Sequence, residues 1–169
     1  PIYSKSFLNR IKLGNFNDDI HKIKNADWII EVVVEKLEIK HQVFDLIEKH
    51  RTPGTIVTSN TSGIPIKLMS KGRSDDFNKN FAITHFFNPP RYMKLLEIVK
   101  NEQTSLETYN SLTSFCRSIL NKGIVPAKDN PNFIGNRVGI FSLMSAIKLS
   151  IIKNIKIEEV DFLTGAICG

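Results

Sequence analysis

The sequence predicts an α/β domain followed by the beginning of an all-helical domain. Between residues 27 and 128, short runs rich in β-branched residues alternate with longer segments whose apolar residues recur at helical spacing. After Pro131 the pattern changes to long segments of helical spacing without a strand signal. A chain of 169 residues with 41% hydrophobic content is long enough to bury one ordinary core. We therefore divide the sequence into residues 1–130 and 131–169.

Five short apolar runs predict the strands of the sheet. Apart from Asp27 and Glu31, residues 27–34 are β-branched or aromatic, which favours a buried strand. Residues 81–87 form a similar run, which stops at Asn88 and Pro89 because proline cannot continue a central ladder. The predicted strands comprise residues 27–34, 55–59, 81–87, 95–99 and 123–128.

Helical segments lie between these strands and after them. Residues 37–50 place a row of apolar side chains on one face, as a helix packed on a sheet requires. Thr104-x-x-Glu107 is a possible capping box for a later helix. The predicted helices comprise residues 37–50, 65–71, 106–120, 133–155 and 157–168.

Composition and charge argue against several classes of protein. The net charge of +6 comes from scattered basic residues, without the Lys and Arg stripe that nucleic-acid binding favours. No apolar run approaches the ~20 residues of a membrane-spanning helix. The two cysteines, Cys116 and Cys168, are too few for a disulfide framework and are expected to be buried thiols. The histidines lack metal-ligand spacing, so we expect no metal, no nucleic acid and no membrane as partners.

Polar residues follow three of the predicted strands at the point where each strand ends. Glu35 follows the first strand, residues 59–62 follow the second, and residues 85–88 end the third. Open α/β sheets bind ligands in the crevice beyond the carboxyl ends of their strands. Three polar clusters at such positions therefore favour a ligand or active site there.

His85 interrupts an otherwise apolar strand, where a histidine is more often a core residue than a base. Glu97 follows twelve residues later on the next apolar run, after a turn through residues 88–94. If the two runs form neighbouring strands, the carboxylate would fix the tautomer of His85 and stabilise the imidazolium formed when His85 takes a proton. The sequence contains no G-x-S-x-G elbow, so the pair favours a general base over a hydrolase nucleophile.

Five motifs along the chain match one family in order and near its spacing. They are residues 33–40 (VVEKLEIK), 59–62 (SNTS), 84–89 (THFFNP), 93–97 (MKLLE) and 128–137 (KDNPNFIGNR). Together they resemble the L-3-hydroxyacyl-CoA dehydrogenase family, which implies a partial Rossmann-like NAD-binding domain and the start of a helical domain. Asn132 stands where the family often has glycine, and asparagine tolerates the dihedral angles that such a turn needs.

The resemblance implies NAD-dependent oxidation of an L-3-hydroxyacyl-CoA to the 3-ketoacyl-CoA in fatty-acid β-oxidation. His85 would remove the proton of the 3-hydroxyl group, and Glu97 would orient His85. Ser62 would hydrogen-bond the reacting oxygen beside the nicotinamide, and Asn136 would contact the acyl part of the substrate. Alternatively, Ser62 could cap the helix that begins near Pro65, and Asn136 could serve only the junction between the domains.

The cofactor implied by the resemblance is NAD. Glu35 and Lys40 match family positions near its ribose and nicotinamide, and Asn88 matches a position near the nicotinamide. Glu35 and Lys40 could instead belong to a solvated helix start. The chain contains no G-x-G-x-x-G turn of the kind that cradles a pyrophosphate. We therefore expect an internal piece of a longer protein, with the main NAD anchor in preceding sequence and residues 1–26 as the tail of a region that contacts CoA.

Two other interpretations stay open. A 3-hydroxybutyryl-CoA dehydrogenase shares these motifs and differs mainly in acyl length. A non-catalytic protein of the same fold, like the lens crystallins related to the family, is less favoured because packing alone would not need His85, Glu97, Ser62 and Asn136 together. The resemblance also implies an acyl-CoA substrate, a homodimer, and fusion to or association with an enoyl-CoA hydratase. The expected location is the cytoplasm of a bacterium, or the mitochondrial matrix of a eukaryote.

Overall fold

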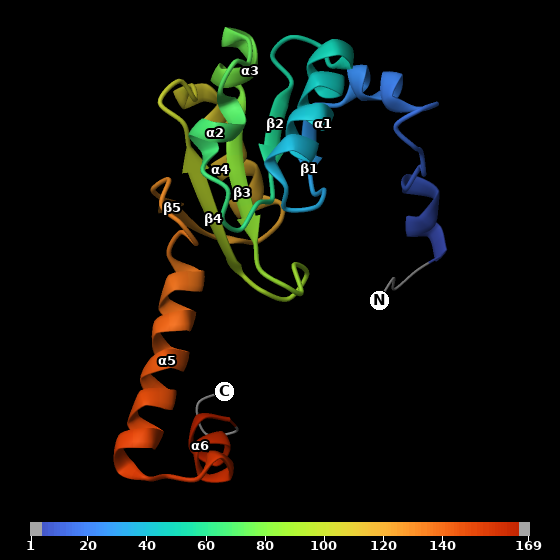
Figure 1. Cartoon of the computed structure of the whole chain (residues 1–169). Helices are drawn as coiled ribbons and strands as arrows, with labels where there is room; N and C mark the ends of the chain where they lie inside the picture. The colour runs from blue at the N-terminus through green and yellow to red at the C-terminus, as the bar shows by residue number, and fades with distance from the viewer. Residues whose placement is uncertain (1–4, 166–169) are drawn as a thin grey trace.

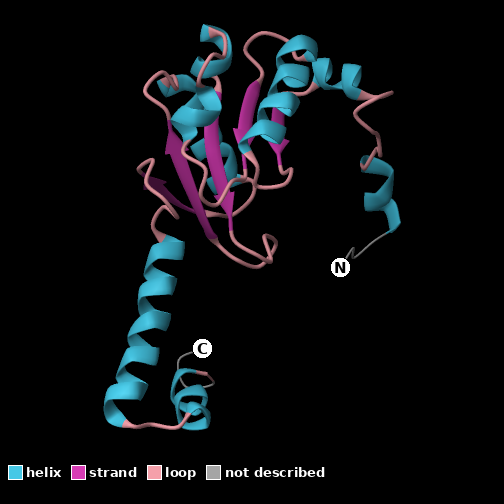
Figure 2. Ribbon diagram, in the orientation of Figure 1, coloured by secondary structure: helices cyan, strands magenta, loops and turns pink. Residues whose placement is uncertain are grey.

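A five-stranded sheet forms the centre of the molecule, with helices on both of its faces (Figures 1 and 2). The computed structural model describes residues 5–165 and confirms the α/β fold. The strands are β1 (Trp28–Glu31), β2 (Ile56–Ser59), β3 (Phe81–Phe86), β4 (Leu95–Lys100) and β5 (Gly123–Ala127). The helices are α1 (Leu37–His50), α2 (Ile66–Ser70), α3 (Asp75–Lys79), α4 (Leu106–Ser118), α5 (Gly135–Lys153) and α6 (Ile157–Thr164). Two 3-10 helices, Lys5–Arg10 and Ile20–Asn25, precede the first strand.

The directions of the strands bring the polar clusters to one edge of the sheet. β1, β2 and β3 are parallel neighbours, whereas β4 runs antiparallel to β3, and β5 runs parallel to β4. The carboxyl ends of β1, β2 and β3 therefore meet at the same edge as the amino end of β4. In Figure 1 this edge is the lower end of the sheet. The residues that follow the first three strands thus share one end of the molecule.

Alternate residues of β3 pack against different helices. Phe81 and Ile83 join apolar residues of α1, α2 and α3 in one buried cluster. Ala82, which lies between them, packs with Leu112 of α4 in a second cluster on the opposite face. This alternation is the period-2 pattern of a strand that is covered on both faces. His85 continues the series of Phe81 and Ile83, so its side chain lies on the face of α1, α2 and α3.

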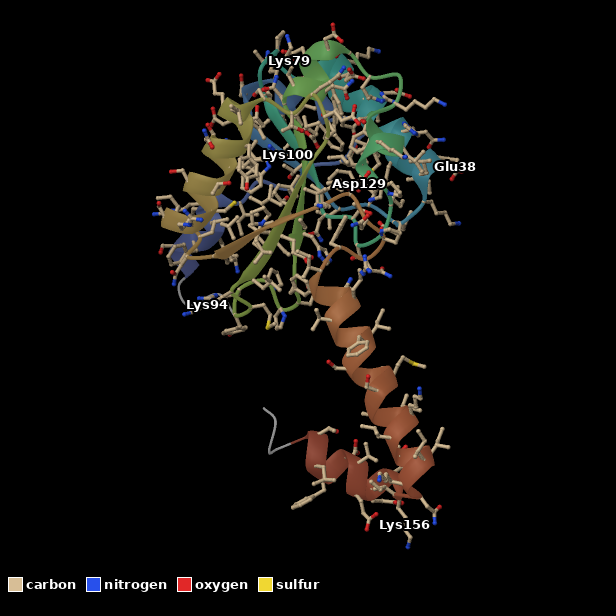
Figure 3. All side chains as sticks on the ribbon, turned by 90° about the vertical axis from the view of Figure 1, so that its left-hand side faces the viewer. Glu38, Lys79, Lys94, Lys100, Asp129 and Lys156 are labelled. Atoms are coloured by element: carbon tan, nitrogen blue, oxygen red, sulfur yellow. The ribbon has the colours of Figure 1, made fainter. Side chains whose placement is uncertain are left out.

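Helix α5 leaves the sheet and carries α6 near its far end (Figure 1). Side chains project from several sides of α5 away from the sheet (Figure 3). Val138, Phe141 and Ile151 of this helix are all more than half exposed. No helix in the described part of the chain is long and apolar enough to cross a membrane. The division expected at residue 131 stays a prediction, and it lies just before this helix begins.

The residue that caps the start of helix α4 is Ser105 and not Thr104. The Ser105 hydroxyl accepts the N–H of Thr108, whereas the Thr104 hydroxyl donates to the carbonyl of Phe81 at 2.7 Å. The capping box predicted from Thr104 and Glu107 is therefore wrong, because Thr104 ties the turn before the helix to β3 instead.

Other boundaries differ modestly from the sequence prediction. Helix α1 matches residues 37–50, but β1 is shorter than 27–34 because the chain leaves the sheet after Glu31. The pattern does not predict α3, a five-residue helix whose first turn is capped by Ser74. The last four residues of the chain, which include Cys168 and the end of the predicted final helix, lie outside the described residues.

Candidate active site

His85 is the fifth residue of β3, and it is only 4% exposed. A buried imidazole needs partners for both ring nitrogens. Nδ1 lies 2.7 Å from Oε2 of Glu97, and Nε2 lies 3.1 Å from Oγ of Ser62. An ionised carboxylate only accepts, so we assign the ring proton to Nδ1 and leave Nε2 as the acceptor that faces Ser62.

Glu97 faces His85 because β4 returns antiparallel to β3 and pairs these two residues directly. The predicted juxtaposition is therefore present. Glu97 is completely buried, so its carboxylate needs several partners. While Oε2 meets His85, Oε1 accepts the N–H groups of Ile134 at 2.8 Å and Gly135 at 2.7 Å. These N–H groups open α5, where a helix carries partial positive charge, so Glu97 also joins α5 to the sheet.

Two phenylalanine rings enclose the imidazole. The ring centroid of Phe87 lies 4.6 Å from that of His85, and that of Phe133 lies 5.5 Å away. The turn that positions Phe133 uses left-handed backbone at both Asn132, with φ of 60°, and Phe133, with φ of 45°. Asparagine suits this conformation better than most residues, as expected from the sequence, whereas an aromatic residue rarely adopts it. The turn thus brings an apolar ring over the buried His85–Glu97 pair and then starts α5.

Ser62 lies in the loop after β2, and Glu35 holds this loop. Oε1 of Glu35 accepts the N–H groups of Ser62 at 3.0 Å and Gly63 at 3.1 Å, and it also accepts the hydroxyl of Thr61. These bonds fix the backbone on both sides of the Ser62 side chain. The loop therefore directs the Ser62 hydroxyl to Nε2 of His85.

The alternative role of Ser62 as a helix cap finds no support in the hydrogen bonds. Thr61 accepts the N–H of Ile64 at 3.0 Å. At the start of α2, the Asp129 carboxylate accepts the N–H of Ile66 at 2.8 Å. Sequence reasoning missed Asp129, which caps α2 from a position 63 residues away.

The environment of Glu35 favours its ionised form. Burial opposes ionisation, but the hydrogen bond from Thr61, the charge of Lys40 and the N–H groups of Gly63 and Ser62 outweigh it and lower the pKa of the Glu35 carboxyl. Since 45% of the side chain is exposed, the carboxylate is also accessible from solvent.

Lys40 is almost completely buried, with 1% exposure. Its ammonium lies 2.9 Å from both carboxylate oxygens of Glu31 and 3.4 Å from Oε2 of Glu35. A solvated helix start is therefore the wrong description of Lys40, because two carboxylates hold its charge inside the protein. Sequence reasoning also missed Glu31, although an acidic residue within the apolar run of residues 28–34 could have indicated a buried ion pair.

Asn88 and Asn136 lie at the margins of this cluster. Asn88 is exposed and lies two residues beyond β3, and Asn136 is half-buried in the first turn of α5. Within the described residues, neither is a hydrogen-bond partner of His85 or Ser62. Asn136 occupies a segment that the cluster anchors, since Glu97 binds the start of α5. Their roles stay predictions.

Lys122 anchors the loop that carries Asn88, a contact that the sequence did not indicate. Its side chain is mostly buried, and its ammonium donates to the carbonyls of Pro90 and Met93, the latter at 2.7 Å. Buried charges require such partners. The loop between β3 and β4 is therefore fixed by Lys122, the residue that precedes β5.

The exposed polar groups of the site suit a nicotinamide cofactor. Glu35, Ser62 and Asn88 lie beyond the carboxyl ends of three parallel strands, where α/β sheets bind nucleotides. A carboxylate accepts hydrogen bonds from ribose hydroxyls, and an asparagine amide can both donate to and accept from a carboxamide. The described residues contain no cluster of side chains arranged to hold a metal ion.

The sequence is similar to those of several known proteins. Residues 2–130 match a family model described as "3-hydroxyacyl-CoA dehydrogenase, NAD binding domain". A probable 3-hydroxyacyl-CoA dehydrogenase of Bacillus subtilis is 47% identical over 169 residues, which are 100% of this chain and 21% of the relative. One from Deinococcus radiodurans is 40% identical over 159 residues, covering 94% of this chain and 46% of the relative.

A solved structure shows the same fold. The (S)-3-hydroxybutyryl-CoA dehydrogenase PaaH1 from Ralstonia eutropha superposes with a TM-score of 0.82 at 27% identity, over 96% of this chain and 56% of that one. The chain therefore spans between about a fifth and somewhat over half of the length of these three relatives.

Proposed function

The chain belongs to the 3-hydroxyacyl-CoA dehydrogenase family, and we propose that it carries the acid–base half of a site that oxidises an L-3-hydroxyacyl-CoA to the 3-ketoacyl-CoA in fatty-acid β-oxidation. The observation that carries this proposal is the continuous series of contacts from Glu97 through His85 to Ser62. It supplies a carboxylate, a base and a hydroxyl donor in one line, and these groups can remove the proton of an alcohol and hold its oxygen while the hydride passes to the cofactor.

His85 is the proposed general base. The Glu97 carboxylate keeps the ring proton on Nδ1, so the lone pair of Nε2 is free to accept the proton of the substrate hydroxyl. Glu97 then stabilises the imidazolium that results. Its own charge stays balanced by the two N–H groups at the start of α5, so it need not take the proton itself.

Ser62 positions the reacting oxygen. Its hydroxyl lies 3.1 Å from Nε2, so an oxygen that binds beside these two groups can contact both. The rings of Phe87 and Phe133 limit the access of water to the buried side of the imidazole, which strengthens the interaction with Glu97.

The proposed contacts with NAD involve Glu35, Ser62 and Asn88 at the carboxyl ends of the strands. Lys40, which the resemblance also places near NAD, is buried between Glu31 and Glu35 and would act through Glu35. When bound, NAD supplies the acceptor for the hydride that leaves C3 of the substrate. Glu35 would bind a ribose hydroxyl of the cofactor, and Asn88 would lie near the nicotinamide. Asn136 would contact the acyl portion from α5.

The experiment that tests the proposal is His85→Gln in the complete protein. Glutamine retains hydrogen-bonding groups but cannot take a proton, so kcat/KM for a 3-hydroxyacyl-CoA, followed by NADH absorbance, should fall at least ~100-fold. His50 ends α1, at the edge of the sheet opposite to the site, and His50→Gln should keep the wild-type rate. A His85→Gln protein with wild-type activity would show that the base is another group.

We further propose the associations of the complete protein. A homodimer is proposed from the family resemblance, and the exposed apolar side chains of α5, among them Phe141 and Ile151, form a surface that such a partner or further helices of the complete protein would cover. Relatives named as putative fatty acid oxidation complex trifunctional enzymes, such as that of Rickettsia felis with 38% identity, support fusion to or association with an enoyl-CoA hydratase. Bacterial relatives and a mitochondrial enzyme of Rattus norvegicus support a cytoplasmic or mitochondrial-matrix location.

A further inference from the structure

We propose that Glu31 is a positioning residue, which sets the place of Ser62 through Lys40 and Glu35. This inference rests on the proposed function of Ser62 in holding the reacting oxygen. Within the described residues, neither His85 nor Ser62 is a hydrogen-bond partner of Glu31. Glu31 would therefore act on Ser62 through Lys40 and Glu35.

Glu31 ends β1 and is 3% exposed. Its two carboxylate oxygens accept four hydrogen bonds from three groups: the ammonium of Lys40 at 2.9 Å to each oxygen, the N–H of Val33 at 2.6 Å, and the hydroxyl of Ser59 at 2.5 Å. These donors come from α1, from the loop after β1 and from the end of β2. A side chain bonded from three directions is held in one conformation. Glu31 therefore gives Lys40 a fixed point of attachment.

Lys40 transmits this fixed position to Glu35. An ammonium group has three N–H donors, and here three carboxylate oxygens surround it: both oxygens of Glu31 and Oε2 of Glu35, which lies 3.4 Å away. Glu35 is thus the more distant of the two carboxylates that share the charge of Lys40. The charge of Lys40 is one of the influences that lower the pKa of Glu35.

Glu35 in turn fixes the loop of Ser62. Its Oε2 meets Lys40, while its Oε1 accepts the N–H groups of Ser62 and Gly63 and the hydroxyl of Thr61. The Glu35 carboxylate thus links the Glu31–Lys40 ion pair to the backbone of the loop that carries Ser62. Loss of Glu31 would leave Glu35 as the sole carboxylate for a buried ammonium. Glu35 would then move toward Lys40 and away from the loop, because a buried charge requires its partner.

Glu31→Gln tests this inference, since it removes the charge and keeps the shape. In the complete protein we expect kcat for 3-hydroxyacyl-CoA oxidation to fall about tenfold or more, because small displacements of a positioned group are costly. KM for the acyl-CoA should stay within about twofold of wild type, because the acyl-binding residues lie elsewhere. Asp45→Asn is the matched control, since Asp45 pairs with Arg73 on the exposed side of α1 and should leave kcat unchanged.

The decisive comparison repeats Glu31→Gln in a Ser62→Ala background. If Glu31 acts through Ser62, the further loss of kcat in that background should be less than about twofold. An equal loss with and without Ser62 would overturn the inference, because Glu31 would then act on something else. Should His85→Gln retain activity in the same assay, the proposed function fails, and that outcome is separate from either result of the Glu31 comparison.

A second variant addresses folding. Glu31→Gln leaves a buried lysine partly uncompensated and lowers the thermal midpoint, whereas the double change Glu31→Gln with Lys40→Met removes both charges and should recover much of it. We expect kcat of this double variant to stay low, since Glu35 has lost its attachment. Recovery of kcat together with the thermal midpoint would show that the ion pair serves stability alone.

Discussion

Gly135→Ala tests whether the start of α5 is packed as closely against the site as the structure indicates. A Cβ at this position would lie 2.5 Å from Cζ of Phe87, 3.0 Å from Cε1 of the same ring and 3.3 Å from Cδ2 of Leu95. The Phe87 ring packs against His85 at an interplanar angle of 57°, so it cannot withdraw without disturbing the imidazole. The N–H of Gly135 also donates to Glu97, and a shift of α5 would lengthen that bond.

The magnitude follows from a comparison with Gly139 in the same helix, where an added Cβ meets nothing within 4 Å. Gly139→Ala should stabilise the protein by up to about 1 kcal/mol through helix propensity alone. Gly135→Ala has the same gain at most, and overpacking against Phe87 opposes it by about 1–3 kcal/mol. The free energy of unfolding should therefore be about 1–3 kcal/mol lower for Gly135→Ala than for Gly139→Ala.

Urea unfolding of the two variants of the complete protein measures this difference, and the NADH assay measures its effect on activity. We expect Gly139→Ala to keep the wild-type kcat and Gly135→Ala to lose activity as the Phe87 ring and the Glu97 bond shift. Equal stabilities and equal activities of the two variants would refute the close approach of α5 to the site.

Two further predictions concern other parts of the fold. Burial raises the pKa of the Cys116 thiol to about 11. Iodoacetamide at pH 8 should therefore alkylate Cys116 in the native protein at least ~10-fold more slowly than in urea, as peptide mass mapping would show. Equal alkylation rates would contradict the burial of Cys116. Burial opposes ionisation of Glu48, but bonds from Ser74 and Arg73 prevail and lower the pKa of the Glu48 carboxyl. A lowered pKa contributes stability above the unfolded pKa and loses it as the pH falls through the folded pKa. Ser74→Ala, which also removes the cap of α3, should thus cost about 1 kcal/mol near pH 7 and less near pH 3; an equal cost at both pH values would exclude the contribution of Glu48.

The pairing of His85 with Glu97 could be predicted from the sequence because it depends on local rules. Two apolar runs joined by a proline-containing turn favour neighbouring antiparallel strands, and the structure pairs these two residues directly. The alternation along β3 also places His85 on one face of the sheet without reference to distant residues. The general position of the site at the strand ends follows from the same rules.

The supporting contacts could not be predicted because distant segments make them. Nothing in the local pattern around Glu97 indicates that its carboxylate accepts hydrogen bonds from two N–H groups at the start of α5, 37 and 38 residues later. Lys40 resembles a solvated residue at a helix start, and only the packing of α1 beside β1 brings it to Glu31. The wrongly predicted cap of α4 has the same cause, because the Thr104 hydroxyl donates to the carbonyl of Phe81 in β3, a contact that the local pattern does not indicate.

The most direct test of the proposed site is a crystal structure of the complete protein with NAD and a 3-ketoacyl-CoA. We expect the C3 oxygen of the ligand to lie about 2.6–3.2 Å from both Nε2 of His85 and Oγ of Ser62, with Glu97 still on Nδ1. A ligand whose C3 oxygen lies away from both groups, with Ser62 still bonded to His85, would contradict the assignment of His85 as the base.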